Sequence, residues 1–205
     1  MDYTALADKK IIDETIKNLA LNGVEGIFVE NGAVALEKIK ELIPVGVSVM
    51  NGSSVTLEQI GFVDYLKGGK HGWNNLHDGI LVEKDPVKQA GLRKQAVLSD
   101  YYLGSVHALA ETGQFLIASN SGSQLPHITF TSASLIFVVG AQKIVPNIDE
   151  AFKRLNEYVI PLEDVRLMKQ YGVHTFPSKV LVFNRENPMM GRKVRMIIVG
   201  ETLGF

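Results

Sequence analysis

The chain has 205 residues, of which 46% are hydrophobic and 21% are charged. This balance supplies a buried core together with a solvated surface, so it excludes an intrinsically disordered chain. The formal net charge of -1 lacks the positive field with which nucleic-acid-binding proteins collect phosphates, so DNA and RNA are not expected partners.

The absence of cysteine excludes disulfides, thiol nucleophiles and an iron-sulfur cluster ligated by this chain's own thiolates. The start of the chain lacks the apolar segment of a secretion signal, and no segment approaches the ~20 apolar residues that cross a bilayer. We therefore expect a cytoplasmic protein without a membrane partner. The histidines show no compact ligand spacing, so no metal site is predicted and no cofactor is identified. They are His71, His77, His107, His127 and His174.

The first half of the chain alternates helical and strand-like patterns. Apolar residues recur at helical spacing over residues 8–21 and 33–42, and short apolar runs at 24–29 and 45–49 indicate strands. A further helix is expected after the turn at residues 51–54. This order favours a parallel sheet with helices packed on its faces. Residues 67–79 hold four glycines and are expected to form a long irregular connection.

The second half mixes helices with a predicted hairpin. Pro86 suits the first turn of a helix that we expect to run to about Tyr101. The apolar runs at residues 105–110 and 114–118 flank a glycine-bearing turn, which predicts an antiparallel hairpin within the parallel framework. The strongly apolar run at 135–139 predicts a central strand. Two helices separated by Pro161 are expected at 148–159 and 162–171, and two strands at 179–183 and 194–199.

The pattern as a whole predicts one α/β domain over residues 1–205, with a mostly parallel, Rossmann-like sheet flanked by helices and an antiparallel hairpin. No internal repeat or interdomain linker interrupts it. The apolar helices and the Leu/Phe-rich tail would permit a homodimer.

Two small polar loops are the predicted ligand-binding elements. Ligands in open α/β sheets gather at the carboxyl ends of strands, where helix N-termini present free N–H groups. We expect the two loops to form two walls of one pocket for a phosphate or carboxylate. The alternative is that their hydroxyls only cap local turns and helices. The predicted ligand-binding residues of these loops are Asn51, Gly52, Ser53, Ser54, Thr56, Asn120, Ser121, Gly122 and Ser123.

Glu111 is the carboxylate that the sequence singles out for chemistry. It follows an apolar strand, and a partly desolvated glutamate can act as a nucleophile or a proton acceptor. We therefore predict Glu111 as the catalytic residue, with Thr112 and Gly113 beside it in ligand binding. The alternative is a solvated hairpin-loop glutamate without a chemical role.

Three motifs in a fixed order carry a family resemblance. They are Asn51-Gly52-Ser53-Ser54-Val55-Thr56-Leu57, then Ala110-Glu111-Thr112-Gly113, then Ile144-Val145-Pro146-Asn147-Ile148. With this order and separation the chain resembles the LUD (lactate-utilisation) domain family, which includes the LutC and YkgG proteins. The resemblance covers about residues 10–183.

The resemblance implies the NagB/RpiA/CoA transferase-like fold of ribose-phosphate isomerases, glucosamine-phosphate deaminases and acyl-CoA transferases. It implies a protein of organic-acid (lactate) metabolism that binds a small anionic, phosphorylated or CoA/nucleotide-like ligand. Glu111 is then similar to the glutamate that attacks the thioester in acyl-CoA transferases. The alternative is a non-catalytic accessory subunit whose cysteine-bearing partner holds the iron-sulfur clusters of a lactate-oxidation system. Whether the chain is an enzyme stays open at this point.

Overall fold

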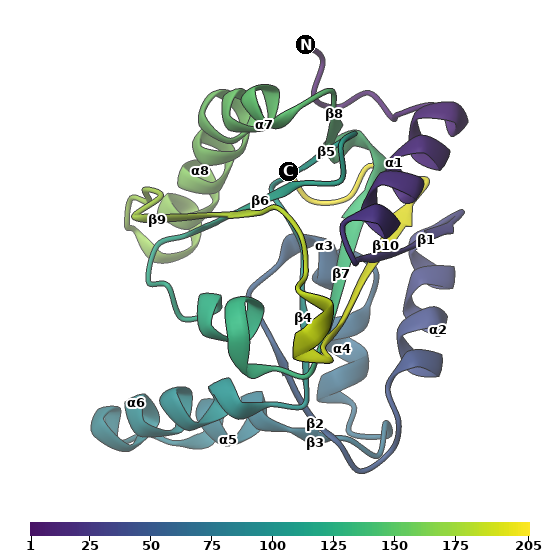
Figure 1. Cartoon of the computed structure of the whole chain (residues 1–205). Helices are drawn as coiled ribbons and strands as arrows, with labels where there is room; N and C mark the ends of the chain where they lie inside the picture. The colour runs from purple at the N-terminus through teal and green to yellow at the C-terminus, as the bar shows by residue number, and fades with distance from the viewer.

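The computed structural model describes residues 1–205 and contains two β-sheets (Figure 1). The larger sheet has six strands in the order β1-β10-β7-β4-β2-β3, and every neighbouring pair is parallel. Its strands are β1 (Glu25–Val29), β2 (Ser48–Asn51), β3 (Asn74–Asn75), β4 (Tyr101–Gly104), β7 (Ser134–Gly140) and β10 (Lys193–Val199). The α/β class with a parallel sheet is confirmed.

The smaller sheet has four strands in the order β8-β5-β6-β9. Its strands are β5 (Ala108–Ala110), β6 (Phe115–Ser119), β8 (Ile144–Val145) and β9 (Lys179–Phe183). β5 and β6 form the expected antiparallel hairpin. The hairpin pairs with β8 and β9 in this second sheet, so it does not interrupt the parallel framework as the sequence pattern had suggested.

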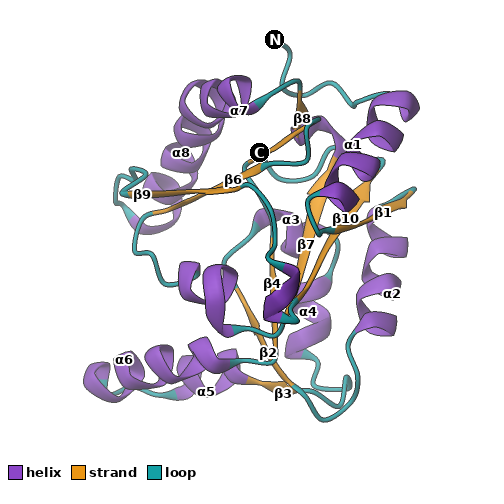
Figure 2. Ribbon diagram, in the orientation of Figure 1, coloured by secondary structure: helices purple, strands orange, loops and turns teal.

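The central strand β7 explains how the layers are held together. All its residues are buried, and successive side chains point to opposite faces of the sheet. Leu135, Phe137 and Val139 pack in one apolar cluster with α1 (Lys9–Leu21) and the smaller sheet. Ile136 and Val138 pack in another with α2 (Gly32–Leu42), α3 (Val55–Gln59) and α4 (Phe62–Lys67). The larger sheet therefore has helices on one face and α1 with the smaller sheet on the other (Figure 2).

Polar side chains cap the N-termini of the first two helices. The Asp8 carboxylate accepts a hydrogen bond from the Ile11 backbone N–H at 2.9 Å, and Asn31 does the same for Val34 at 3.0 Å. Such caps satisfy backbone donors that have no partner within the helix.

Two expectations for the middle of the chain were wrong. The helix that begins at Pro86 is α6 (Pro86–Gln95), and residues 101–104 form strand β4 between β2 and β7. β4 has only four residues, and no glycine or proline separates it from the preceding helical segment, so its pattern is too short to be read as a strand. The expected irregular connection at 67–79 contains β3 and the start of α5 (Leu76–Val82). Helices α5 and α6 lie side by side and extend away from the body (Figure 1).

The helices near the end of the sequence also differ from expectation. Pro161 does not separate them, because α7 (Ile148–Arg154), a π-helical turn at Leu155–Val159 and α8 (Ile160–Tyr171) follow one another without a break. Proline has no backbone N–H to donate, and Pro161 lies just after the π-helical turn, where the regular α-helical hydrogen-bond pattern is already interrupted. No helix combines the length and apolar character needed to cross a membrane.

Candidate functional site

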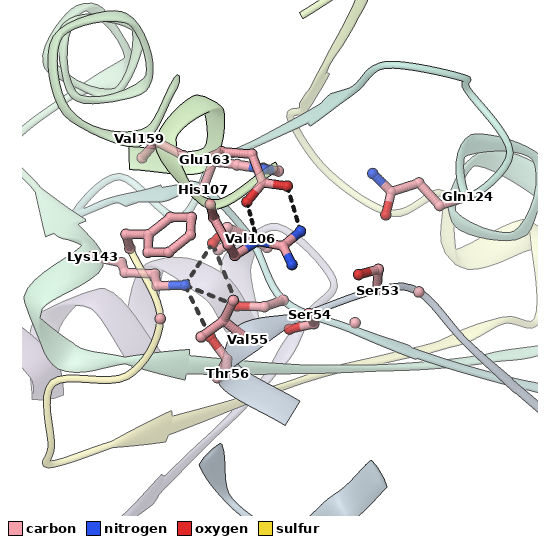
Figure 3. A pocket seen from close by; sticks show the side chains of 16 residues that line it. Ser53, Ser54, Val55, Thr56, Val106, His107, Gln124, Lys143, Val159 and Glu163 are labelled. Atoms are coloured by element: carbon pink, nitrogen blue, oxygen red, sulfur yellow. Dashed lines mark hydrogen bonds and ion pairs between the residues drawn. The ribbon is translucent and has the colours of Figure 1, made fainter. Parts of the chain in front are cut away.

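The carboxyl ends of three parallel strands surround a cavity of about 120 Å³, the inner cavity (Figure 3). One wall is the loop between β2 and α3, and another is the segment that links β4 to β5. Lys143, which follows β7 in the chain, also lines this cavity. Glu163 and Arg166 line it from α8. A cavity at this edge is what a parallel α/β sheet predicts.

An outer cavity of about 320 Å³ adjoins the inner one, and both are lined by Gly52, Ser53 and Gln124. Gly52 is required at the junction, because a Cβ atom there would lie 2.4 Å from the Tyr102 hydroxyl. That hydroxyl donates to the Gln124 amide oxygen at 3.3 Å. The Gly52 backbone on the first polar loop therefore packs against the Tyr102 hydroxyl, which is bonded to Gln124 on the second polar loop.

Lys143 is the most unusual group of the site. Its side chain is 2% exposed, and its ammonium donates to the Thr56 hydroxyl at 3.1 Å, the Ser105 hydroxyl at 3.2 Å and the Val106 carbonyl at 3.3 Å. None of these acceptors carries a charge, and no carboxylate forms an ion pair with this lysine. Burial, followed by the nearby charge of Arg154, lowers the pKa of Lys143 to about 7.

Arg154 is a second buried cation behind the inner cavity. It is fully buried, and one of its terminal nitrogens donates to the His107 carbonyl. Its guanidinium lies over the rings of Tyr3 and Tyr158, with centroid distances of 5.9 and 5.2 Å, while Nε and Nη2 have no hydrogen-bond partner. Burial lowers the pKa of Arg154 to about 10. Arg154 lines neither cavity, so its positive charge lies behind the inner cavity and not at its surface.

His107 lines the inner cavity as a neutral ring. Burial, together with Lys143 and Arg154, lowers its pKa to about 3. Its Nδ1 accepts a hydrogen bond from the Ala118 backbone N–H at 3.1 Å, which places the proton of the neutral imidazole on Nε2. His107 can therefore donate a hydrogen bond to a ligand from Nε2.

Glu163 and Arg166 form a bidentate ion pair on the α8 wall, with two N–O distances of 2.7 Å. The Glu163 carboxylate is the main reason why the pKa of Arg166 is raised. A third guanidinium N–H binds Gln170 at 2.9 Å, which leaves two of the five N–H groups of Arg166 free. With Lys143 protonated, the side chains that line the inner cavity carry two positive charges, on Lys143 and Arg166, and one negative charge, on Glu163.

A histidine and an aspartate lie beside the outer cavity. His174 lines it, and the Nδ1 of that ring is 2.9 Å from the Asp164 carboxylate. The backbone N–H of Thr175 and the His174 ring hold the pKa of Asp164 below its ordinary value. The His174 side chain is largely exposed.

The structure brings the two predicted loops together. Most of the residues predicted for ligand binding line one or both cavities, and Ser54 also caps α3 by accepting from the Leu57 N–H at 3.3 Å. The capping alternative and the pocket are thus both realised at one residue. The predicted residues that line the cavities are Gly52, Ser53, Ser54, Thr56, Asn120, Ser121 and Ser123.

The remaining predicted residues lie elsewhere. Glu111 lines neither cavity, because it follows β5 whereas the cavity residue His107 precedes it. Thr112 and Gly113 complete a turn that packs on α1, where Asn18 binds the Glu111 carbonyl at 2.8 Å and Asn22 binds the Thr112 carbonyl at 3.0 Å. The catalytic role of Glu111 stays a prediction that the geometry of the cavities does not support.

Two residues of the predicted loops also turn away from the cavities. Asn51 is buried and lies 3.2 Å from the Nδ1 of His77. Gly122 adopts φ +84° and packs against the Lys179 side chain. Both act on loop shape in this structure.

Sequence patterns did not identify Lys143, Ser105, Glu163 or Arg166. The one available signal was a lysine between two apolar runs, directly after the most apolar strand. No cluster of three or more histidine, aspartate or glutamate side chains is placed to hold a metal ion.

Comparison with known proteins identifies the family. The family model described as the LUD domain matches residues 12–180. The fold is also similar to the crystal structure of a DUF162 family protein from Deinococcus radiodurans, with a TM-score of 0.54 and 12% sequence identity over 96% of this chain and 100% of that chain. At this identity the similarity concerns the fold. A search among curated proteins gave no match. The chain therefore belongs to the LUD domain family.

Proposed function

We propose that this protein binds a small organic anion in the inner cavity, with an extension of the ligand reaching into the outer cavity. The proposal depends on one observation above all, that the Lys143 ammonium borders the cavity without a carboxylate partner. A buried charge is normally paired, so a site that leaves one unpaired favours a ligand of opposite charge.

The size of the cavities favours a particular class of ligand. A cavity of about 150 Å³ accepts a molecule as large as benzene, which has about six heavy atoms. The inner cavity, at about 120 Å³, suits a hydroxy acid, an oxo acid or the phosphate end of a larger molecule. The role in organic-acid metabolism implied by the family resemblance agrees with this size and charge, and it is part of the proposal.

A thermal-shift screen against hydroxy acids, sugar phosphates, nucleotides and acyl-CoA tests this proposal. A ligand at about 100 times its Kd stabilises a protein by about 2.7 kcal/mol, which corresponds to a rise in Tm of about 5–10 °C at this chain length. We expect Lys143→Met to abolish the shift. Lys169→Met is the matched control, because Lys169 is exposed on α8 outside both cavities. An equal shift in both variants would reject the role of Lys143.

A second candidate function is that of an accessory subunit bound to an iron-sulfur protein. The apolar side chains of Leu81, Val82 and Val87 are exposed on the projecting α5–α6 pair, and exposed apolar groups that cluster favour protein partners. The clusters would belong to the partner, because this chain has no cysteine. Capture of an iron-sulfur protein by a chain that binds none of the screened anions would favour this candidate over the first.

A further inference from the structure

We infer that Lys143 forms a covalent imine with the carbonyl carbon of a small 2-oxo acid bound in the inner cavity. The inference rests on the proposed function, since it names the ligand class and the reacting group of the same site. It requires an amine that borders the cavity, that can lose its proton, and that faces groups able to hold a carboxylate.

The surroundings of the amine meet the first two requirements. Figure 3 shows the Lys143 amine directed toward Thr56, in the part of the cavity bounded by Val106. All three of its acceptors are uncharged, so loss of the proton breaks no ion pair. The hydroxyls of Thr56 and Ser105 can donate as well as accept. They can therefore hold a neutral amine in the same place.

The charges around Lys143 favour the neutral form. The titratable and charged side chains that line the inner cavity beside Lys143 are His107 on the β4–β5 segment and Glu163 and Arg166 on α8, and the buried Arg154 of α7 lies behind them. His107 is neutral, and Glu163 is bound to Arg166. The uncompensated neighbour is the buried Arg154. A pKa of about 7 for Lys143 agrees with this arrangement.

Other groups that line the inner cavity can hold the carboxylate. Arg166 keeps two free N–H groups on the α8 wall, and Ser53 and Ser54 present hydroxyls from the β2–α3 loop. A 2-oxo acid places its carboxylate and its carbonyl on adjacent carbon atoms. The smallest members have about six heavy atoms, which is the size that the inner cavity accepts.

The proposed step needs no oxidant, reductant or metal. The lone pair of the neutral amine attacks the carbonyl carbon, and the electron pair of the C=O bond moves to oxygen. The nitrogen, now positively charged, gives up one proton and the oxygen takes one up, which leaves a neutral carbinolamine. The Nε2–H of His107 is available to bind that oxygen. Loss of the resulting hydroxyl group as water, with a proton from nitrogen, then leaves the carbon–nitrogen double bond.

Reductive trapping on the full-length chain tests the imine. Pyruvate is the probe, sodium cyanoborohydride is the reductant, and the modified lysines are located by peptide mass mapping. Reduction adds the mass of pyruvic acid less one oxygen atom. Because burial lowers the pKa of Lys143 to about 7, we expect its labelling near pH 7 to exceed that of exposed Lys169 by at least about tenfold. Equal labelling of the two lysines would overturn the imine.

Two further measurements separate failure of the imine from failure of the binding site. Lactate has a hydroxyl in place of the carbonyl, so it should raise Tm and slow the labelling of Lys143 without forming an adduct. If lactate, phosphate or pyruvate stabilises the chain but Lys143 is not selectively labelled, the imine is wrong and the anion site stands. If none of them binds, both proposals fail. Lys143→Arg keeps the positive charge without a reactive amine and should lose the adduct, and wild-type mapping decides the matter if that variant does not fold.

Discussion

Replacing Lys143 with methionine removes a buried charge and keeps a side chain of similar length. In the folded chain the lysine releases its proton near pH 7, whereas in the unfolded chain it keeps the proton to about its ordinary pKa of 10.5. Between these two values the unfolded state binds more protons, so the free energy of unfolding of the wild type rises with pH. Below pH 7 both states are protonated and this dependence disappears.

The size of the effect follows from the difference between the two pKa values. The slope is about 1.4 kcal/mol for each pH unit, so the stability of the wild type relative to Lys143→Met should rise by about 2.5 kcal/mol between about pH 6 and pH 9. His107 stays neutral throughout this range, and Arg154 begins to titrate only above it. The hydrogen bonds that the variant loses shift its stability without changing this slope.

Urea unfolding at constant ionic strength measures the effect. Trp73 is the single tryptophan and is buried, so its fluorescence reports loss of the core. Lys169→Met is again the control, and its stability should stay parallel to that of the wild type at every pH. A constant difference between wild type and Lys143→Met across the whole range would show that the amine does not titrate near neutral pH.

Three further predictions concern the site and the fold. Glu111→Gln should leave the affinity for an anionic ligand, measured by calorimetry, within about twofold of the wild type, because Glu111 lines neither cavity. A loss of affinity of about tenfold would show that Glu111 takes part in ligand binding. Glu163→Gln leaves Arg166 without its carboxylate partner, so the affinity for an anionic ligand should rise by about fivefold at low salt and less at high salt. An unchanged affinity would show that the Glu163 carboxylate does not oppose anion binding. Gly113→Ala should destabilise the chain by more than about 1 kcal/mol in urea unfolding, because φ is +84° and a Cβ atom would lie 2.8 Å from the Asn18 backbone; an unchanged midpoint would show that the turn relaxes freely.

Local sequence patterns predicted the strands and helices of the parallel sheet, because each signal, such as the apolar run at 135–139, lies within the element that it defines. The glycine-bearing turn likewise predicted the β5–β6 hairpin. The other strand pairings of the smaller sheet could not be found in this way. Its β6–β9 pairing joins Phe115 to Phe183, and nothing in either strand alone indicates which partner it has.

The site residues also differ in whether a local sequence pattern could identify them. The first polar loop follows β2 of the parallel sheet, so the carboxyl-edge rule predicted its place at the cavity. The second polar loop follows β6 of the smaller sheet, so its position beside the first did not follow from that rule. Lys143 could not be assigned to them, because its acceptors at Thr56 and Ser105 are 87 and 38 residues away in the chain. The position of Glu111 was misjudged because the hairpin belongs to the second sheet, where the end of β5 points away from the cavities.

The energetic balance at Lys143 is the strongest physical argument that the site has a function. Burying an amine without a counter-charge lowers stability, and a methionine could fill a similar volume without that cost. Arg154 adds a second buried cation behind the inner cavity, where Tyr3, Tyr158 and the His107 carbonyl contact it but no carboxylate does. The hydrogen bonds of Lys143 likewise go only to uncharged groups, so no charge in the chain offsets the lysine at the edge of the cavity. We expect a bound anion to offset the charge of Lys143, and strongly perturbed groups of this kind cluster at functional sites.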